Sequence, residues 1–150
     1  MANSKELAAL RFMLNREVMA VEIYRRQIWR FRGRKEIAEK LQRAMENEQE
    51  HVNNLKARLA ALSGGSSRLS FIFYLSGTFV MGFGPALLGK RITLKCDIWF
   101  ERLAVKHYNR FLDQTAFADE TKALLEKNKQ DEEKHIKTWS DSLSMMRNKG

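Results

Sequence analysis

Glu48-Gln49-Glu50-His51 is the stretch that decides the fold of this chain. It lies in a segment whose apolar residues recur every three or four positions, which is the spacing of a helix face that packs on a core. That face reads Ile37, Leu41, Ala44, Glu48, His51, Leu55, Leu59 and Leu62. A carboxylate and an imidazole therefore lie one turn apart on a face that should be buried. Because an unpaired buried carboxylate is costly, Glu48 requires a partner.

A second stretch repeats this arrangement, since Glu132 and His135 are also three residues apart. The chain has three histidines, and the two motifs use two of them. A shift of 84 positions extends the agreement. It places Glu17 on Glu101, Tyr24 on Tyr108, Glu48 on Glu132 and His51 on His135. Each half therefore predicts a helix with Glu and then Tyr, followed by a helix with Glu-x-x-His. This inventory matches the carboxylate-bridged di-metal sites of helix bundles.

The composition indicates a single all-helical domain over residues 1–150. One proline and eight glycines leave few turn formers, and 150 residues suffice for one core. The single cysteine, Cys96, excludes an intramolecular disulfide and a cysteine-based metal cluster. The net charge of +9 indicates an anionic partner. An anionic lipid surface is favoured over nucleic acid, because no nucleic-acid-binding motif is present.

The periodicity predicts four long helices in two hairpins. The first runs from near Ser4 to about Phe31, and a tight connection at Gly33 leads to a second that lasts to about Leu62. The third is expected from about Arg91 to Leu112. The remaining predicted inward residues are Leu10, Leu14, Glu17, Val21, Tyr24, Ile28, Leu94, Ile98, Glu101, Val105, Tyr108, Leu112, Leu125, Asn128, Glu132, His135, Trp139 and Leu143.

Other features of these helices follow from the same pattern. The last helix is expected to start with Asp119 as its N-cap. The outer face of the first helix carries Arg16, Arg26 and Arg30, and it is predicted to contact solvent or lipid headgroups. Two helical hairpins with a long crossover predict a ferritin-like four-helix bundle.

Residues 69–89 form the crossover and contain no charged side chain. Their number would suffice to span a bilayer as a helix, but a single crossing would put the two halves of the glutamate set on opposite sides. Gly82-Phe83-Gly84-Pro85 is also expected to interrupt such a helix. The alternatives are simple burial or a segment that lies in one leaflet. Phe71, Phe79 and the other aromatic residues, flanked by Arg68, Lys90 and Arg91, favour the membrane interface.

The glutamates at the waist of such a bundle predict a particular metal chemistry. Two divalent cations would offset the four carboxylates, and oxygen-rich ligands with one imidazole per metal suit iron or manganese. Each histidine should donate its second N–H to an acceptor, for which Asp131 and Asn47 are candidates. Tyr24 and Tyr108 are either core tyrosines or hydrogen-bond partners of the glutamates, and the second interpretation is preferred.

These residues also carry a family resemblance. Glu17 to Gln27, Gly82 to Lys90, Cys96, His107-Tyr108-Asn109 and Asp131 to His135 resemble the demethoxyubiquinone hydroxylases of ubiquinone biosynthesis. The resemblance implies a ferritin-like bundle that is a peripheral, monotopic membrane protein, on the cytoplasmic face of the inner membrane in a bacterium. It implies hydroxylation of a lipophilic polyprenyl benzoquinone by a di-iron centre that uses O2, with NADH as electron source.

The resemblance also assigns roles to residues. Glu17, Glu48, His51, Glu101, Glu132 and His135 match the metal ligands of the family, and His107 and Tyr108 match its pair of residues near the site. A homo-oligomer or a biosynthetic complex is left open. Several positions depart from the family pattern. Leu14-Asn15-Arg16 replaces a His-Ala-Gly run, Phe100 replaces a smaller residue, and Met19 and Arg26 replace glycines.

Two alternatives remain open at the level of sequence. One is a di-iron oxidase or peroxide-scavenging protein of the rubrerythrin type without an organic substrate, although a chain with one cysteine lacks the usual Cys-rich electron-transfer module. The other is a helical membrane-surface protein without enzymatic activity, in which arginines pair the buried carboxylates. Metal content distinguishes the second alternative from both di-iron hypotheses.

Overall fold

The computed structural model describes residues 4–63, 75 and 77–148. Within these ranges the chain is helical and contains no strand. The elements are α1 (Ser4–Phe31), α2 (Lys35–Ser63), the π-helix η1 (Gly77–Phe83), α4 (Gly84–Leu87), α5 (Lys90–Gln114) and α6 (Asp119–Arg147).

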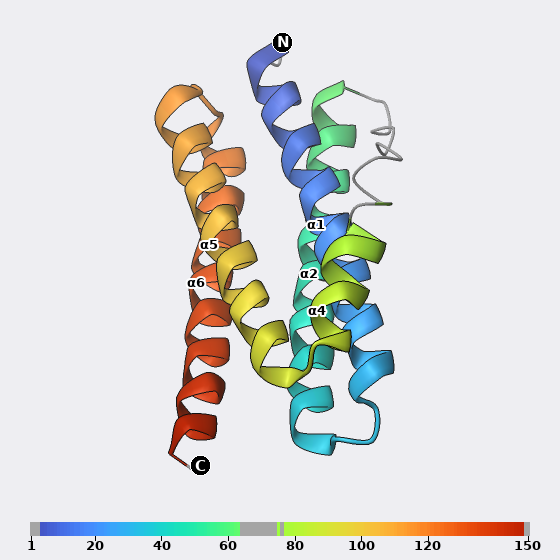
Figure 1. Cartoon of the computed structure of the whole chain (residues 1–150). Coiled ribbons are helices and arrows are strands. Elements are labelled where there is room, and N and C mark those ends of the chain that lie inside the picture. Colours follow the sequence, from blue (N-terminus) through green and yellow to red (C-terminus); the bar gives the residue numbers. More distant parts are fainter. Residues whose placement is uncertain (1–3, 64–74, 76, 149–150) are drawn as a thin grey trace.

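The four long helices form two antiparallel hairpins that lie side by side, α1 with α2 and α5 with α6 (Figure 1). The hairpins meet where α2 packs on α6, and η1 and α4 lie along α1 before the chain enters α5. The predicted all-α, ferritin-like bundle is therefore confirmed.

The helix ends follow the predicted positions with one exception. The connection at Gly33 is tight, because the N–H of Arg34 donates to the carbonyl of Phe31 at 2.8 Å. The prediction that Asp119 caps α6 was wrong. Ala118 is the N-cap residue and makes no side-chain capping bond, while Asp119 is the first helical residue. At this position its negative charge still interacts favourably with the positive, N-terminal end of the helix dipole.

Two of the apolar clusters in the described residues are the largest, and the predicted buried glutamates lie between them. On α2, Leu41 belongs to one cluster and Leu55 to the other, with Glu48 between them in the chain. The same order holds on α6, where Leu125 and Trp139 flank Glu132. The predicted inward faces are buried, apart from five half-buried residues, Ile28, Leu62, Val105, Leu112 and Leu143. A polar waist is thus closed off from water at both ends by packed side chains.

The crossover is described only from residue 77 onward, apart from Leu75. Phe71 and the flanking Arg68 of the predicted interface segment lie outside the described residues. At Gly82–Pro85 the described chain stays helical and changes from π to α geometry, with Pro85 at the start of α4. The chain then reverses at Gly89, whose φ of 102° favours glycine. No helix in the described ranges is both long and apolar enough for a membrane span.

Two glycines of η1 bring it close to α1. A Cβ atom at Gly77 would lie 2.1 Å from Cγ of Met19, and one at Gly82 would lie 3.0 Å from Cβ of Arg26. Met19 and Arg26 stand where the resembling family has glycines. In this chain, the space that these larger side chains need is left by glycines on the facing helix.

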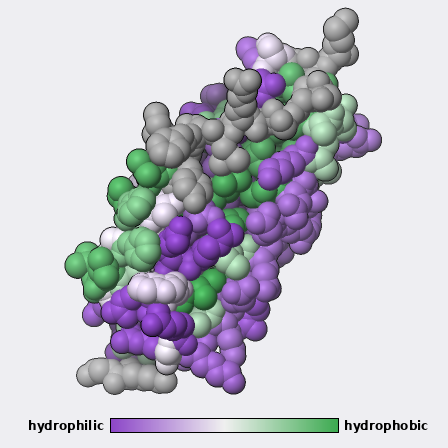
Figure 2. All heavy atoms as spheres, turned by 90° about the vertical axis from the view of Figure 1, so that its right-hand side faces the viewer, coloured by the Kyte–Doolittle hydropathy of each residue, from purple (hydrophilic) through white to green (hydrophobic). Residues whose placement is uncertain are grey.

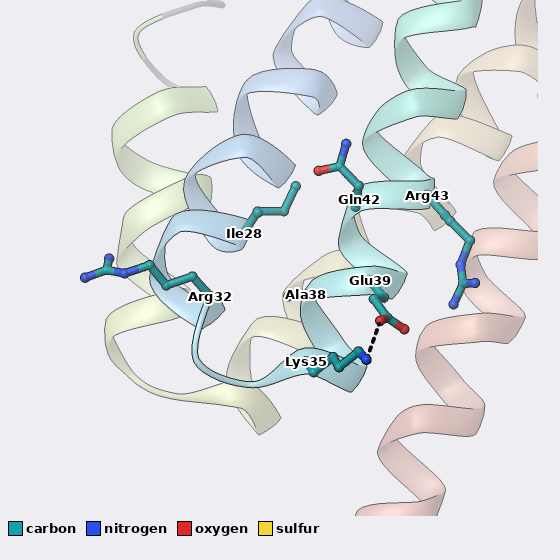
Figure 3. Close-up of a pocket in the computed structure, with 7 residues that line it drawn as sticks. All are labelled: Ile28, Arg32, Lys35, Ala38, Glu39, Gln42 and Arg43. Atoms are coloured by element: carbon teal, nitrogen blue, oxygen red, sulfur yellow. Dashed lines mark ion pairs between the residues drawn. The ribbon is translucent and has the colours of Figure 1, made fainter.

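A wide, open groove lies at the end of the α1–α2 hairpin (Figure 3). Its volume is about 710 Å³, and a Lys35–Glu39 ion pair at 3.9 Å stands at its edge. Both partners of that pair are exposed, and such pairs contribute little to stability. The groove contains none of the residues predicted to carry chemistry.

Candidate metal centre

The six predicted ligand residues converge in two overlapping groups. One group is Glu17, Glu48, His51 and Glu132, and the other is Glu48, Glu101, Glu132 and His135. In each group the ligand atoms lie within 4.8 Å of one another, and every residue is buried. Glu48 and Glu132 belong to both groups. The cluster therefore has the donor set and the shared carboxylates of a two-metal site.

Helix geometry explains this convergence. On α2 and α6, residues three apart lie on the same face, so each Glu-x-x-His motif points its two side chains inward together. The histidines face the shared Glu48 almost symmetrically. Nδ1 of His51 lies 3.3 Å from one carboxylate oxygen of Glu48, and Nδ1 of His135 lies 3.1 Å from the other. The offset of 84 in the sequence thus appears as an approximate two-fold arrangement.

Many buried polar atoms of this cluster make no hydrogen bond within the described part of the chain. They include both carboxylate oxygens of Glu48 and of Glu132, and Nδ1 of His51 and of His135. They lie within ion-pair distance of one another, but so many buried polar atoms without a hydrogen bond in one place require a common explanation. Carboxylate oxygens and imidazole nitrogens are the donors that iron and manganese prefer. The residues present therefore fit a pair of such ions.

The protonation of the cluster follows from burial and crowding. Burial and the neighbouring carboxylates raise the pKa of Glu17 and of Glu101 well above the ordinary value. Burial also acts on the histidines and lowers their pKa, but Glu132 and Glu48 outweigh it. The pKa of His51 is raised to about 12 and that of His135 to about 11. Without metal, both imidazoles are thus protonated at neutral pH.

A carboxylate orients one of the two histidines from behind. Nε2 of His51 lies 3.3 Å from Oδ2 of Asp131, which leaves Nδ1 facing the cluster. Nζ of Lys134 in turn donates a hydrogen bond to Oδ1 of Asp131 at 2.8 Å. The prediction that Asp131 serves as acceptor is confirmed. Asn47 contacts Asp131 at 3.5 Å, and no hydrogen bond joins it to His135 within the described residues.

The two tyrosines connect the hairpins. The hydroxyl of Tyr108 on α5 donates to Glu17 on α1 at 2.5 Å, and the hydroxyl of Tyr24 on α1 donates to Glu101 on α5. Burial and the adjacent glutamates raise the pKa of both tyrosines well above 10, so each hydroxyl keeps its proton. The preferred interpretation, hydrogen bonding to the glutamates, is confirmed.

His107 does not join the metal cluster. Its ring packs edge-on against Phe12, with the centroids 5.0 Å apart. Burial and the charge of Arg16 lower the pKa of His107, which favours its neutral form. It lines a cavity of about 250 Å³ between α1, η1 and α5. The other lining residues are Phe12, Arg16, Met19, Val80, Met81, Trp99, Phe100 and Leu103.

Arg16 corrects one sequence-based prediction. It was expected on an outer face, but only 3% of its surface is exposed. Its guanidinium reaches from α1 to α5, where Nη2 donates to the carbonyl of Phe100 at 2.9 Å and the group lies 4.2 Å from the centre of the Phe100 ring. The 84-residue offset pairs Arg16 with the apolar Phe100, and that pairing was the available signal that the position faces inward.

Sequence analysis also missed a buried pair beside the cluster. Nε2 of Gln27 donates to Oδ1 of Asp97 at 2.7 Å, and the other oxygen of Asp97 has no partner within the described residues. Burial raises the pKa of Asp97 to about 7. Asp97 lies one turn before Glu101, on a face where periodicity alone predicts an apolar residue.

We expect Asp97→Asn to stabilise the metal-free protein at high pH. Between about pH 4 and pH 7 the unfolded chain ionises at this position while the folded chain keeps its proton, so stability falls as the pH rises. The asparagine cannot ionise and still accepts the bond from Gln27. At pH 8 the gain should approach about 4 kcal/mol, and it should vanish near pH 4.

Urea unfolding at pH 4 and pH 8 measures this difference. Asp113→Asn on the same helix is the matched control, because Asp113 is exposed. A gain that is equal at both pH values would contradict the assignment of a buried protonated Asp97.

Comparisons with known proteins agree with this geometry. A family model described as ubiquinone biosynthesis protein COQ7 matches residues 8–145. The 3-demethoxyubiquinol 3-hydroxylase of Methylibium petroleiphilum is 30% identical over 134 residues, which cover 87% of this chain and 62% of that protein. The enzyme of the same name from Alcanivorax borkumensis is 31% identical over 103 residues, covering 68% of this chain and 47% of the relative.

A third enzyme of that name, from Nitrosococcus oceani, is 32% identical over 101 residues, which cover 67% of this chain and 47% of the relative. The matched part of this chain thus spans about half to three fifths of the length of these relatives. No solved structure gives a significant match.

Proposed function

This chain belongs to the COQ7 family of ubiquinone biosynthesis proteins, and on that premise we propose that it hydroxylates a demethoxyubiquinone-type ring with O2 at a di-iron centre. The observation that supports this most is the pair of buried ligand groups that share Glu48 and Glu132. Relatives named 3-demethoxyubiquinol 3-hydroxylase support the choice of reaction and of substrate.

The proposed ligands divide evenly between the two metals. Glu17 and His51 would hold one iron, Glu101 and His135 would hold the other, and the shared glutamates would bridge them. The two irons would supply the activation of dioxygen. The protein would supply a dry waist, closed by the apolar clusters, in which charges are stabilised by fixed groups and not by water. NADH as the source of electrons is part of the same proposal.

The cavity beside His107 would receive the ring. It is lined mostly by apolar side chains, and Arg16 and Phe100 at its wall directly precede the ligands Glu17 and Glu101 in the chain. Its volume of about 250 Å³ is suited to a single ring and not to a long polyprenyl tail. Val80 and Met81 of η1 form part of the wall, so the crossover lies beside the entrance that a lipid substrate would use.

A surface of exposed apolar side chains supports peripheral membrane attachment. Phe79, Val80, Leu87, Leu88 and Trp99 are each more than half exposed. Apolar side chains gather along one edge of the face in Figure 2, in the region of η1 and α4. Lys90 and Arg91 come after Leu88 and Gly89 in the chain and would contact anionic headgroups. This surface would place the cavity beside the membrane from which a lipophilic quinone comes.

We expect Phe79→Ser/Leu88→Ser to weaken binding to anionic lipid vesicles by at least about tenfold, because two large apolar side chains would no longer enter the leaflet. Co-sedimentation with vesicles measures the effect. Met145→Ser is the matched control, since Met145 is 49% exposed on α6, outside this surface. Equal binding by the double variant and the control would reject this attachment surface.

Tyr108→Phe should keep its metal and slow the reaction. The hydroxyl donates to Glu17 and accepts a bond from Nδ2 of Asn128 at 3.2 Å, so its loss frees one ligand oxygen without removing a ligand. We expect unchanged iron content and turnover lowered about ten- to a hundredfold, the usual cost of losing a group that orients a ligand. Iron analysis and rapid-mixing kinetics measure the two effects. Loss of iron would show instead that Tyr108 holds the site together.

The proposed function is tested by loading the protein anaerobically with ferrous iron, then adding O2 with and without a demethoxylated quinol. The expected result is a hydroxylated ring and oxygen consumption that depends on the quinol. Equal oxygen consumption without quinol, and no hydroxylated product, would favour the oxidase or peroxide-scavenging alternative. If the protein takes up no iron under reducing conditions, the remaining hypothesis is the helical membrane-surface protein that has no enzymatic activity.

A further inference from the structure

Arg16 carries a permanent positive charge that the described residues only partly compensate. It is 3% exposed, its Nη2 lies 3.8 Å from Oε2 of Glu101, and its Nε has no hydrogen-bond partner within the described residues. Oε2 of Glu101 also lacks such a partner. An arginine does not lose its proton in a protein, so this charge must be met by an anion.

Among the described residues, Glu101 is the one carboxylate within ion-pair distance of Arg16, and it is also a proposed metal ligand. When Glu101 holds a metal, its negative charge would be offset by that ion. The guanidinium would then be a weakly compensated buried cation at the wall of the apolar cavity.

We propose that Arg16 is a specificity-determining residue that binds the substrate ring as a monoanion, with one ring hydroxyl deprotonated and its oxygen beside the guanidinium. The inference rests on the proposed function and adds the charge state of the substrate. The ring would lie in the cavity formed with Phe100 and His107, whose apolar walls would strengthen a charge-assisted bond. The Phe100 ring beneath the guanidinium fixes the plane of the donors.

The cavity favours a ring hydroxyl over a small inorganic anion. An inorganic anion would lose its hydration among Phe12, Met81 and Leu103 without gaining polar partners there. An aromatic phenolate instead buries an apolar ring and exposes one charged oxygen to Arg16. The apolar lining and the single cation thus select the same kind of ligand.

The test uses the zinc-loaded protein and 4-nitrophenol, whose phenolate absorbs visible light and whose neutral form does not. Zinc is colourless and does not change redox state, so the absorption reports only the ligand. We expect the phenolate band to appear on binding, with an affinity about tenfold higher for the wild type than for Arg16→Gln. Arg16→Lys, which keeps the charge, should recover part of the affinity.

Two further variants complete the design. Arg16→Met keeps the length and the packing on Phe100, and it serves as the neutral variant if Arg16→Gln fails to fold or to bind zinc. Arg25→Gln is the matched control, because Arg25 is exposed and pairs with Glu22 on its own helix. Equal affinity in the wild type and the neutral variants would overturn the inference.

Two other outcomes separate the parts of the proposal. Azide that competes with equal affinity and the same dependence on Arg16 would overturn the assignment to a ring hydroxyl. A protein that binds the phenolate through Arg16 but never hydroxylates a quinol would retain the inference about Arg16. That result would reject the proposed function alone.

Discussion

Glu48→Ala is expected to reduce the iron content from about two ions per chain to nearly none. Glu48 belongs to both candidate ligand groups, so its removal would take one carboxylate from both groups at once. The helix should survive, because alanine is the strongest helix former. The metal-free variant should be less stable than the metal-free wild type, because Glu48 pairs with both protonated imidazoles and removing one partner of a buried ion pair is costly. Elemental analysis and thermal unfolding measure the two effects.

Glu46→Ala is the matched control for this substitution. Glu46 lies two residues earlier on α2, is exposed, and accepts a hydrogen bond only from Gln42 among the described contacts. This control should keep both irons. A Glu48→Ala protein that still binds two irons would show that Glu48 is not a shared ligand, and one that retains a single iron would assign it to one metal.

Metal affinity is expected to fall steeply as the pH is lowered. Both imidazoles must lose a proton to bind metal, and their pKa values in the metal-free protein are raised to about 12 and about 11. At neutral pH the metal must displace these protons, so each metal should bind up to about tenfold more weakly per pH unit of acidification. Glu17 and Glu101, whose pKa values are also raised, would steepen this dependence.

Calorimetry in buffers of different ionisation enthalpy counts the protons that are released when manganese or ferrous ion binds. The wild type should release at least about one proton per metal at pH 7. The Asp131→Asn variant should still release them, because Asp131 faces the opposite nitrogen of His51. An affinity that is flat from pH 6 to pH 8 would show that the histidines are already neutral and that their charge is not the barrier to loading.

Much of the site was predictable because it repeats. The 84-residue offset fixed which glutamates, histidines and tyrosines belong together, and helical spacing fixed the faces that they occupy. The offset did not say which tyrosine contacts which glutamate. Tyr108 reaches Glu17 and Tyr24 reaches Glu101 across the two hairpins, a relation that depends on how the hairpins are placed side by side.

The residues that sequence analysis missed have a common cause. Arg16 and Asp97 are charged side chains at buried positions, and polarity is normally taken as a sign of exposure. Each can be buried because it makes a specific contact. Arg16 donates to the carbonyl of Phe100 and lies over its ring, and Asp97 accepts a hydrogen bond from the amide of Gln27. Such partners lie 84 and 70 residues away, beyond the reach of periodicity.

The departures from the family pattern are explained by contacts between residues that are far apart in the sequence. Met19 and Arg26 are larger than the glycines expected there, but Gly77 and Gly82 leave room for them on η1. Arg16 and Phe100 pack on each other at the wall of the cavity. The substitutions are therefore matched to one another, and they alter the cavity while leaving all the proposed ligands in place.

The two-metal centre is the claim on which the other proposals depend, and anomalous diffraction at the iron edge tests it most directly. Crystals grown from iron-loaded protein should show two anomalous peaks about 3.5–4 Å apart, the usual separation in two-metal sites. Both peaks should lie between Glu48 and Glu132, with one beside His51 and the other beside His135. A single peak, or peaks outside these residues, would contradict the account.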